Sequence, residues 1–330
     1  MAALSATVDP DGLDDYTALQ TGNATEAQDL TDGGGDTFTF TCRSSSGTAD
    51  TTNVDFTAWD TAAASYILVE AANGDEVLKT SYDATRYRLE DTDAHPLRNQ
   101  ENYFRANGLQ IKHTYVGTAN RHGLNIVFIA GGGSDIRVTN CRIQAATHAD
   151  SNAVGLRVSD TDAAVTFENN IIEGGDVAGI LVNAAAGSKV YNNVVYGSTL
   201  AGIELDTTAT VKNNAVSATT TDIQDDAGDS TVDYNASDDG TGTNAQTIIA
   251  IGNEFANAAG GDFTAQTGGV IEDNGVGPDT DAAVPTPDID GTTRAGAACY
   301  IGPDELVAAG GNAPTGALQG PLGGPLAGVF

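Results

Sequence analysis

The sequence is poor in cationic side chains and in cysteine, and each shortage excludes a class of protein. Lysine and arginine together number 14 against 45 aspartates and glutamates, which gives a formal net charge of −31. A surface with this charge repels phosphate backbones and anionic lipids, so we expect neither nucleic acid nor membrane as a partner. The three scattered cysteines, Cys42, Cys141 and Cys299, imply no disulfide framework and are expected as buried free thiols.

Long apolar runs are also absent. No stretch of 18 apolar residues occurs, so the sequence predicts no membrane-spanning helix. The first residues, MAALSATVDPDG, lack the basic region and apolar core of a secretory signal, and we expect none. By contrast, the chain holds 40 glycines in 330 residues, which favours many short turns between strands.

A repeat dominates the middle of the chain. The segments 165–174 (VTFENNIIEG), 189–198 (KVYNNVVYGS) and 210–218 (TVKNNAVSA) each contain a short β-branched strand, an Asn-Asn pair and a second short strand. A second phrase recurs between them, as GLRV at 155–158, GILV at 179–182 and GIEL at 202–205. Two phrases that recur in one order at nearly one period indicate a solenoid.

The repeat predicts an all-β parallel β-helix. Each phrase alternates with strand periodicity and leaves no room for a helix, and the spacing of a leucine-rich repeat is absent. At roughly 23 residues per coil, the segment from Phe38 to Ile301 would make about 11 coils. The apolar residues expected to point inward are Val165, Phe167, Ile172, Ile180, Val182, Val190, Val194, Ile203 and Val211.

The asparagines are predicted to build a structural corner. Asparagine tolerates the left-handed backbone that a sharp bend needs. Stacked asparagine side chains can also donate hydrogen bonds from one coil to the next. The residues assigned to this corner are Asn140, Asn170, Asn193 and Asn214.

The ends of the chain are expected to differ from the coils. Residues 1–13 are interpreted as a loose arm, and Asp14-Asp15 as the cap of a helix at about 16–30 that covers the first coil. The β-helix with this helix is placed at 14–305. The tail 306–330 has no charged residue and is interpreted either as a disordered end or as an apolar assembly peptide. Its anchor residues would be Leu318, Leu322, Leu326 and Phe330.

Two late segments, 255–276 and 287–305, resemble the closing coils of pectate-lyase-like right-handed β-helix proteins of bacteria and phages. The residues that carry the resemblance are Gly261-Asp262-Phe263, Asp288-Ile289-Asp290-Gly291, Arg294 and Tyr300-Ile301-Gly302-Pro303-Asp304-Glu305. The resemblance extends over about 14–305 and implies a single-stranded, right-handed parallel β-helix. It leaves the function open, because the group includes enzymes, adhesins and virion proteins.

Lyases of this group use an arginine or lysine base beside a Ca²⁺ ion held by carboxylates. The catalytic candidates are Arg137, Arg157, His148 and Asp150, with Arg137 and Arg157 expected near one face. The metal candidates are Asp225, Asp226 and Asp229, which would suit Ca²⁺, although no cofactor is required. A structural or solvated role is the alternative for each, and the lyase motifs themselves are missing, so the sequence favours a protein that is not an enzyme.

These observations lead to an expected function. The chain is expected to be a structural, surface-exposed protein of a tailed-phage virion: a head fibre, a decoration protein or a tail fibre. Its partners would be other virion or surface proteins, further copies of itself (a trimer is one option) and host polysaccharide. The alternatives are a polysaccharide lyase, glycoside hydrolase or carbohydrate-binding β-helix protein, and a bacterial surface adhesin.

Overall fold

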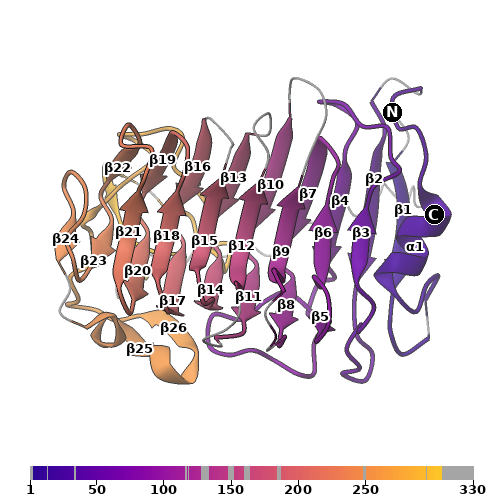
Figure 1. Ribbon diagram of the computed structural model, residues 1–330, viewed down its shortest axis with the longest axis horizontal. Coiled ribbons are helices and arrows are strands. Elements are labelled where there is room, and N and C mark those ends of the chain that lie inside the picture. Colours follow the sequence, from indigo (N-terminus) through magenta and orange to yellow (C-terminus); the bar gives the residue numbers. More distant parts are fainter. Residues whose placement is uncertain are drawn as a thin grey trace, which may run out of the picture.

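The computed structural model describes residues 3–306 except 13, 33–34, 116, 118, 128–133, 148–151, 160–163, 184–186, 248–249 and 295. In this part of the chain the strands stack along one long axis as a parallel β-helix, which confirms the predicted fold (Figure 1). Each central coil contributes one strand to each of three parallel sheets, which we name I, II and III, while the coils at the two ends contribute to fewer of them.

The strands of each sheet follow in spatial order. Sheet I contains β1 (Ala3–Val8), β2 (Thr37–Cys42), β4 (Ile67–Ala71), β7 (Tyr103–Asn107), β10 (Asp135–Thr139), β13 (Val165–Glu168), β16 (Ser188–Tyr191), β19 (Ala209–Lys212) and β22 (Thr231–Asp233). Sheet II contains β5 (Arg88–Asp91), β8 (Gln110–His113), β11 (Arg142–Ala145), β14 (Ile171–Gly174), β17 (Val194–Ser198), β20 (Ala215–Ala218), β23 (Ala236–Ser237) and β24 (Gln246–Thr247). Sheet III contains β3 (Val54–Phe56), β6 (Leu97–Asn99), β9 (His122–Val127), β12 (Val154–Ser159), β15 (Ala178–Asn183), β18 (Ala201–Leu205) and β21 (Thr221–Asp225).

The stack is shorter than the sequence predicts. Sheet I has nine strands among the described residues, so the expected 11 coils are too many. The segments 255–276 and 287–305, which resemble closing coils, lie outside the stack, within residues 251–306. Their elements are η1 (Ile251–Asn253), β25 (Phe255–Asn257), η2 (Ala258–Gly260), β26 (Asp262–Ala265), β27 (Gly275–Val276) and β28 (Ala298–Cys299), and they form two antiparallel pairs, β25–β26 and β27–β28.

We call residues 251–306 the strap, because they lie back along the side of the coils. The backbone N–H of Phe263 donates to the carbonyl of Lys79 at 2.9 Å, near the early coils. The Nδ2 of Asn169 donates to the carbonyl of Pro287, and the Nδ2 of Asn213 donates to that of Val276. The strap strands are two to four residues long and pair with one another in antiparallel fashion, so they do not extend the three parallel sheets.

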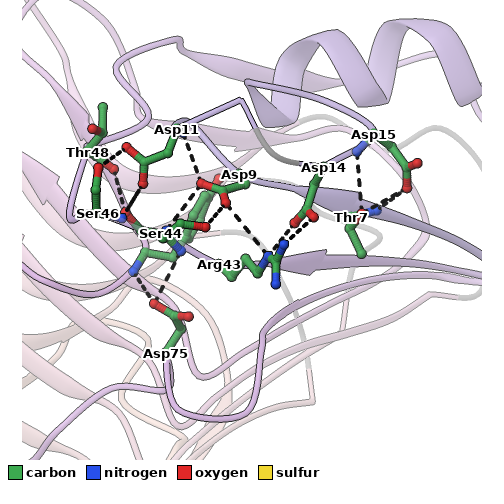
Figure 2. A network of polar contacts seen from close by, with 12 residues as sticks. Thr7, Asp9, Asp11, Asp14, Asp15, Arg43, Ser44, Ser46, Thr48 and Asp75 are labelled. Carbon is green, nitrogen blue, oxygen red and sulfur yellow. Dashed lines mark hydrogen bonds and ion pairs between the residues drawn. The ribbon is translucent and has the colours of Figure 1, made fainter.

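Residues 3–12 are ordered, so the interpretation of this segment as part of a loose arm is wrong. Strand β1 pairs in parallel with β2 over six residues, and Ala6 and Val8 are buried in the core. Figure 2 shows why the segment after β1 is held: the carboxylates of Asp9 and Asp11 accept hydrogen bonds from the loop after β2, including the backbone N–H of Ser46 at 2.6 Å. These bonds hold the pKa of Asp11 well below its usual range.

The capping helix exists but is shorter than expected. Helix α1 spans Leu19–Glu26 and packs against β3, at the end of the stack (Figure 1). It begins after Ala18, whose side chain makes no capping hydrogen bond. Asp14 and Asp15 do not cap it, because Asp14 pairs with Arg43 and Asp15 accepts from Thr7. The backbone N–H of Leu19 instead donates to the buried carboxylate of Asp50 at 2.7 Å, so packing and this bond position the helix.

The core confirms most of the predicted inward positions, and all nine predicted residues are buried. Eight of them belong to the central cluster, but Val194 does not. In sheet II it is Val195 that points inward, while Val194 packs outward under Phe255 and Ile301 of the strap. The strap thus gives sheet II a second apolar layer, which the pattern of one coil cannot predict. All three cysteines are buried and free, as expected.

The two asparagines of each pair have different roles at the corner. The first member has a left-handed backbone, with φ of 54–57° at Asn140, Asn169, Asn192 and Asn213. The second member forms a ladder in which the backbone N–H and Nδ2 of one asparagine donate to Oδ1 of the next; its rungs are Asn170, Asn193, Asn214 and Asn235. Asn140 makes the bend at its corner, while Cys141 occupies the ladder position there and donates its N–H to Oδ1 of Asn170.

Removing one rung of the asparagine ladder should lower the stability of the fold. Asn193 is fully buried; its Oδ1 accepts two hydrogen bonds from Asn170, and its Nδ2 donates to the carbonyl of Phe167. In Asn193→Ala these buried groups lose their partner, so we expect the free energy of unfolding to fall by about 2–4 kcal/mol. Urea denaturation would measure the loss. Asn152→Ala, which removes one exposed side-chain bond to Asn120, should change stability by about 0.5 kcal/mol or less, and equal losses in the two variants would refute the ladder's contribution.

Candidate functional site

Three carboxylates gather on the outer side of sheet III. Glu204 lies in β18, Asp206 follows that strand, and Asp226 follows β21 one coil further on. One ligand atom from each lies within 4.8 Å of the others. Burial raises the pKa of Glu204, and the charges of Asp206 and Asp226 raise it further. Such oxygen ligands suit a hard cation such as Ca²⁺.

Of the three predicted metal candidates, the structure brings only Asp226 into this cluster. Asp226 belongs to the cluster, whereas Asp225 accepts hydrogen bonds from Ser230 and Asp229 accepts one from Thr208. At this turn the side chains of sequence neighbours point to different partners, whereas side chains one coil apart lie close together. The coil period was the signal that could have linked Asp206 with Asp226.

Arg157 lies on the same sheet as the carboxylate cluster. It projects from β12, where Nη1 donates to Oδ1 of Asn125 at 3.3 Å. Burial lowers the pKa of this guanidinium, and Asp206 opposes the shift. A cavity of about 290 Å³ beside it is lined by His122, Val154 and Leu181 among others.

Arg137 lies elsewhere, so the expectation that Arg137 and Arg157 share a face is wrong. It projects from β10 in sheet I, where its register partner in the next coil is Thr166. The coil that contains Arg137 is longer than the assumed period of about 23 residues. The two arginines therefore lie on different strands of the same coil, β10 and β12. Arg137 makes two hydrogen bonds to Asp135, at 2.8 and 2.9 Å, and Arg105 also pairs with Asp135.

Several predicted residues cannot be placed. His148 and Asp150 lie outside the described residues, as do Leu318, Leu322, Leu326 and Phe330 of the tail. Two other histidines, His95 and His122, stack at 5.1 Å between ring centroids inside the wall of sheet III. Burial lowers the pKa of His95 to about 4 and that of His122 to about 2, so both rings are neutral.

A groove crosses the outer face of sheet II, and sequence reasoning missed it. Its cavity is about 520 Å³. Its floor follows one row of register partners on consecutive coils, namely Lys112, Gln144, Glu173 and Tyr196. We call this feature the sheet II groove. Glu173 and Tyr196 occupy equivalent places in the repeats NNIIEG and NNVVYG, which was the available signal.

The groove is rigid because the strap supports it. Glu173 accepts hydrogen bonds from Nε of Arg142 at 2.7 Å and from the side-chain amide of Gln144 at 3.1 Å. Arg142 is fully buried, and its other nitrogens donate to the carbonyls of Leu78 and Gly261. The ring of Tyr196 packs edge-on against Phe263 of the strap, at 5.9 Å.

His113 borders the same groove. Its ring is 1% exposed, and neither ring nitrogen has a hydrogen-bond partner. Burial lowers the pKa of His113 to about 4, which leaves the imidazole neutral near pH 7. Both nitrogens are also buried from solvent, so the unpaired donor and acceptor of this imidazole are not open to a molecule in the groove.

The stacked parallel strands and the asparagine ladder define a β-helix solenoid. The sequence profile described as right handed beta helix region matches residues 99–276, more than half of the chain, and the chain belongs to this family. Searches of curated proteins and of solved structures gave no match. Within the described residues, no helix has the length and apolar character needed to cross a membrane.

Proposed function

We propose that the protein is a structural, surface-exposed component of a tailed-phage virion, serving as a head fibre, a decoration protein or a tail fibre. The observation that carries the proposal is the strap. In a solenoid each coil contacts only its neighbours, so the stack can open from its ends. Here the strap contacts Lys79, Arg142, Asn169 and Asn213, which belong to coils far apart along the axis. A rod tied along its length suits a protein displayed in an exposed position.

Purified phage particles provide the test. Immunogold labelling with antibodies against the rod, together with mass spectrometry of particles, should find the protein on the particle surface. Location on a bacterial envelope, with none on particles, would contradict the proposal and favour an adhesin.

The uncharged tail would make the attachment to neighbouring virion proteins or to further copies of the chain. We expect deletion of residues 311–330 to leave the strand signal in circular dichroism unchanged but to lower incorporation into particles or oligomerisation. The physical reason is that a chain with charge −31 needs an uncharged patch for close contact. Equal incorporation of the truncated protein would assign the tail no part in assembly.

A polysaccharide lyase is the second candidate, and one observation favours it. Arg157 and the cluster of Glu204, Asp206 and Asp226 share the outer side of sheet III, as a base and a cation site would. Incubation with polygalacturonate, alginate and host capsule, with and without Ca²⁺, separates the candidates. A rod without lyase activity releases no unsaturated sugar ends. Release that Arg157→Ala abolishes and the matched Arg137→Ala preserves would establish the lyase instead.

A further inference from the structure

We propose that the sheet II groove binds an oligosaccharide built of neutral hexose-type sugars and does not cleave it. The inference deepens the proposed function, on which it depends only for the source of the glycan, a host surface. The binding site itself is argued from the groove.

The side chains of the groove floor are spaced at a regular interval that matches the repeat of a polymeric ligand. Its floor side chains come from β8, β11, β14 and β17, which lie side by side along the axis (Figure 1). Adjacent parallel strands are spaced by about 4.8 Å, close to the length of one pyranose unit. An extended oligosaccharide along the axis therefore meets one side chain per sugar. A second cavity of about 400 Å³ shares Lys112 and Thr114 with the groove and continues it over β5, so several sugar units fit.

The side chains match sugar chemistry. The ring of Tyr196, fixed by Phe263, offers an apolar surface to the C–H face of a pyranose. Gln144 and Glu173 can donate to and accept from neighbouring hydroxyl groups. Because Arg142 and Gln144 already hold the Glu173 carboxylate, little side-chain freedom is lost on binding.

Other ligand classes fit less well. Polyanions are repelled by the net charge of −31, and Lys112 is the single cationic side chain among the described lining residues. A peptide would find no apolar pockets for its side chains on this polar floor. Glycoside hydrolysis uses two carboxyl groups that flank one bond. Glu173 is the one carboxylate among the described residues that line the 520 Å³ cavity, whereas Glu90, Asp91 and Asp93 lie in the second cavity beyond Lys112, so we expect binding without cleavage beside Glu173.

Titration of the full-length protein with fluorescently labelled tetrasaccharides tests the site. The probes are neutral tetramers of glucose, galactose and mannose, together with tetragalacturonate as the anionic arm. We expect a neutral tetramer to bind, and Tyr196→Ala and Gln144→Ala each to weaken binding about tenfold or more. Tyr103→Ala, the same change on sheet I, should leave the affinity unchanged. Thermal melting of each variant separates lost binding from lost fold, and Gln144→Ala decides the question if Tyr196→Ala does not fold.

Any other result would contradict the inference. If no neutral tetramer binds, or if both groove variants bind it as tightly as the parent protein, the groove is not the binding site. Preference for tetragalacturonate would assign the groove to an acidic ligand held by Lys112. Release of shorter sugars would refute binding without cleavage. Labelling of phage particles tests the proposed function separately. If the groove binds sugar but the protein is absent from particles, this inference stands and the proposed function is refuted. If the protein is found on particles but binds no sugar, the proposed function stands and this inference is refuted.

Discussion

Replacing Ile180 by aspartate should abolish the folded state or lower the free energy of unfolding by about 4–5 kcal/mol. Ile180 is fully buried, and its register partners in the flanking coils are Leu156 and Ile203, both also fully buried. An unpaired carboxylate at this point would lie in the central apolar cluster. Chemical denaturation followed by circular dichroism measures the change.

Leu200→Asp is the matched control, because it makes the same kind of change at a nearby exposed position. The side chain of Leu200 is 53% exposed, so a carboxylate there stays in water. Its stability should change by about 0.5 kcal/mol or less. Should Ile180→Asp melt like the parent protein, the inward register of β15 would be wrong.

The coils could be predicted because their information is local and repeated. Phe167, Ile172 and Ile180 each lie in a short alternating strand, and the same pattern returns in the next coil. The Asn-Asn pair also carries its own physical meaning, since one residue must bend the backbone and stacked amides can bond. The sequence could not say which member does which, because the left-handed φ of Asn169 and the ladder bonds of Asn170 depend on the finished stack.

The strap could not be predicted, because its contacts join residues far apart in sequence. Nothing near Val194 in the sequence indicates that Phe255 and Ile301 will cover it from outside. Nothing near Arg142 indicates that Gly261 will accept its hydrogen bond, 119 residues away. The segments that resemble closing coils form the antiparallel pairs of the strap instead of further coils.

The candidate sites were missed for a related reason. Arg137 and Arg157 were paired by an assumed period, but the coils before Val165 are longer than those after it, as the partners Arg137 and Thr166 show. The sheet II groove depends on outward positions of sheet II, which a search for core residues passes over. Glu173 stands out only when Arg142, Gln144 and the strap are placed around it.

Replacing Arg294 by alanine should detach the strap while the coils stay folded. Arg294 is 1% exposed; it donates to Oδ1 of Asn169 at 3.0 Å and to the carbonyls of Pro287 and Gly302 at 3.1 and 2.9 Å. Alanine leaves these buried acceptors, and the nearby carboxylate of Glu305, without their cation. Removing one partner from such a set costs about 3–5 kcal/mol, and the loss should fall first on the strap because the coils keep their own ladders.

The buried cysteines report where the opening occurs. Cys299 lies in the strap at 0% exposure, with its pKa raised by burial to about 12, whereas Cys42 and Cys141 lie in the coils. A thiol reagent reacts with the exposed thiolate, so it reacts only after local release. In Arg294→Ala we expect labelling of Cys299 to accelerate at least tenfold while Cys42 and Cys141 stay protected, with sites assigned by peptide mass spectrometry. Arg137→Ala, which removes an exposed arginine paired with Asp135, should label like the parent protein. Equal acceleration at all three cysteines would mean that strap and coils unfold as one unit, and no acceleration would mean that Arg294 does not hold the strap.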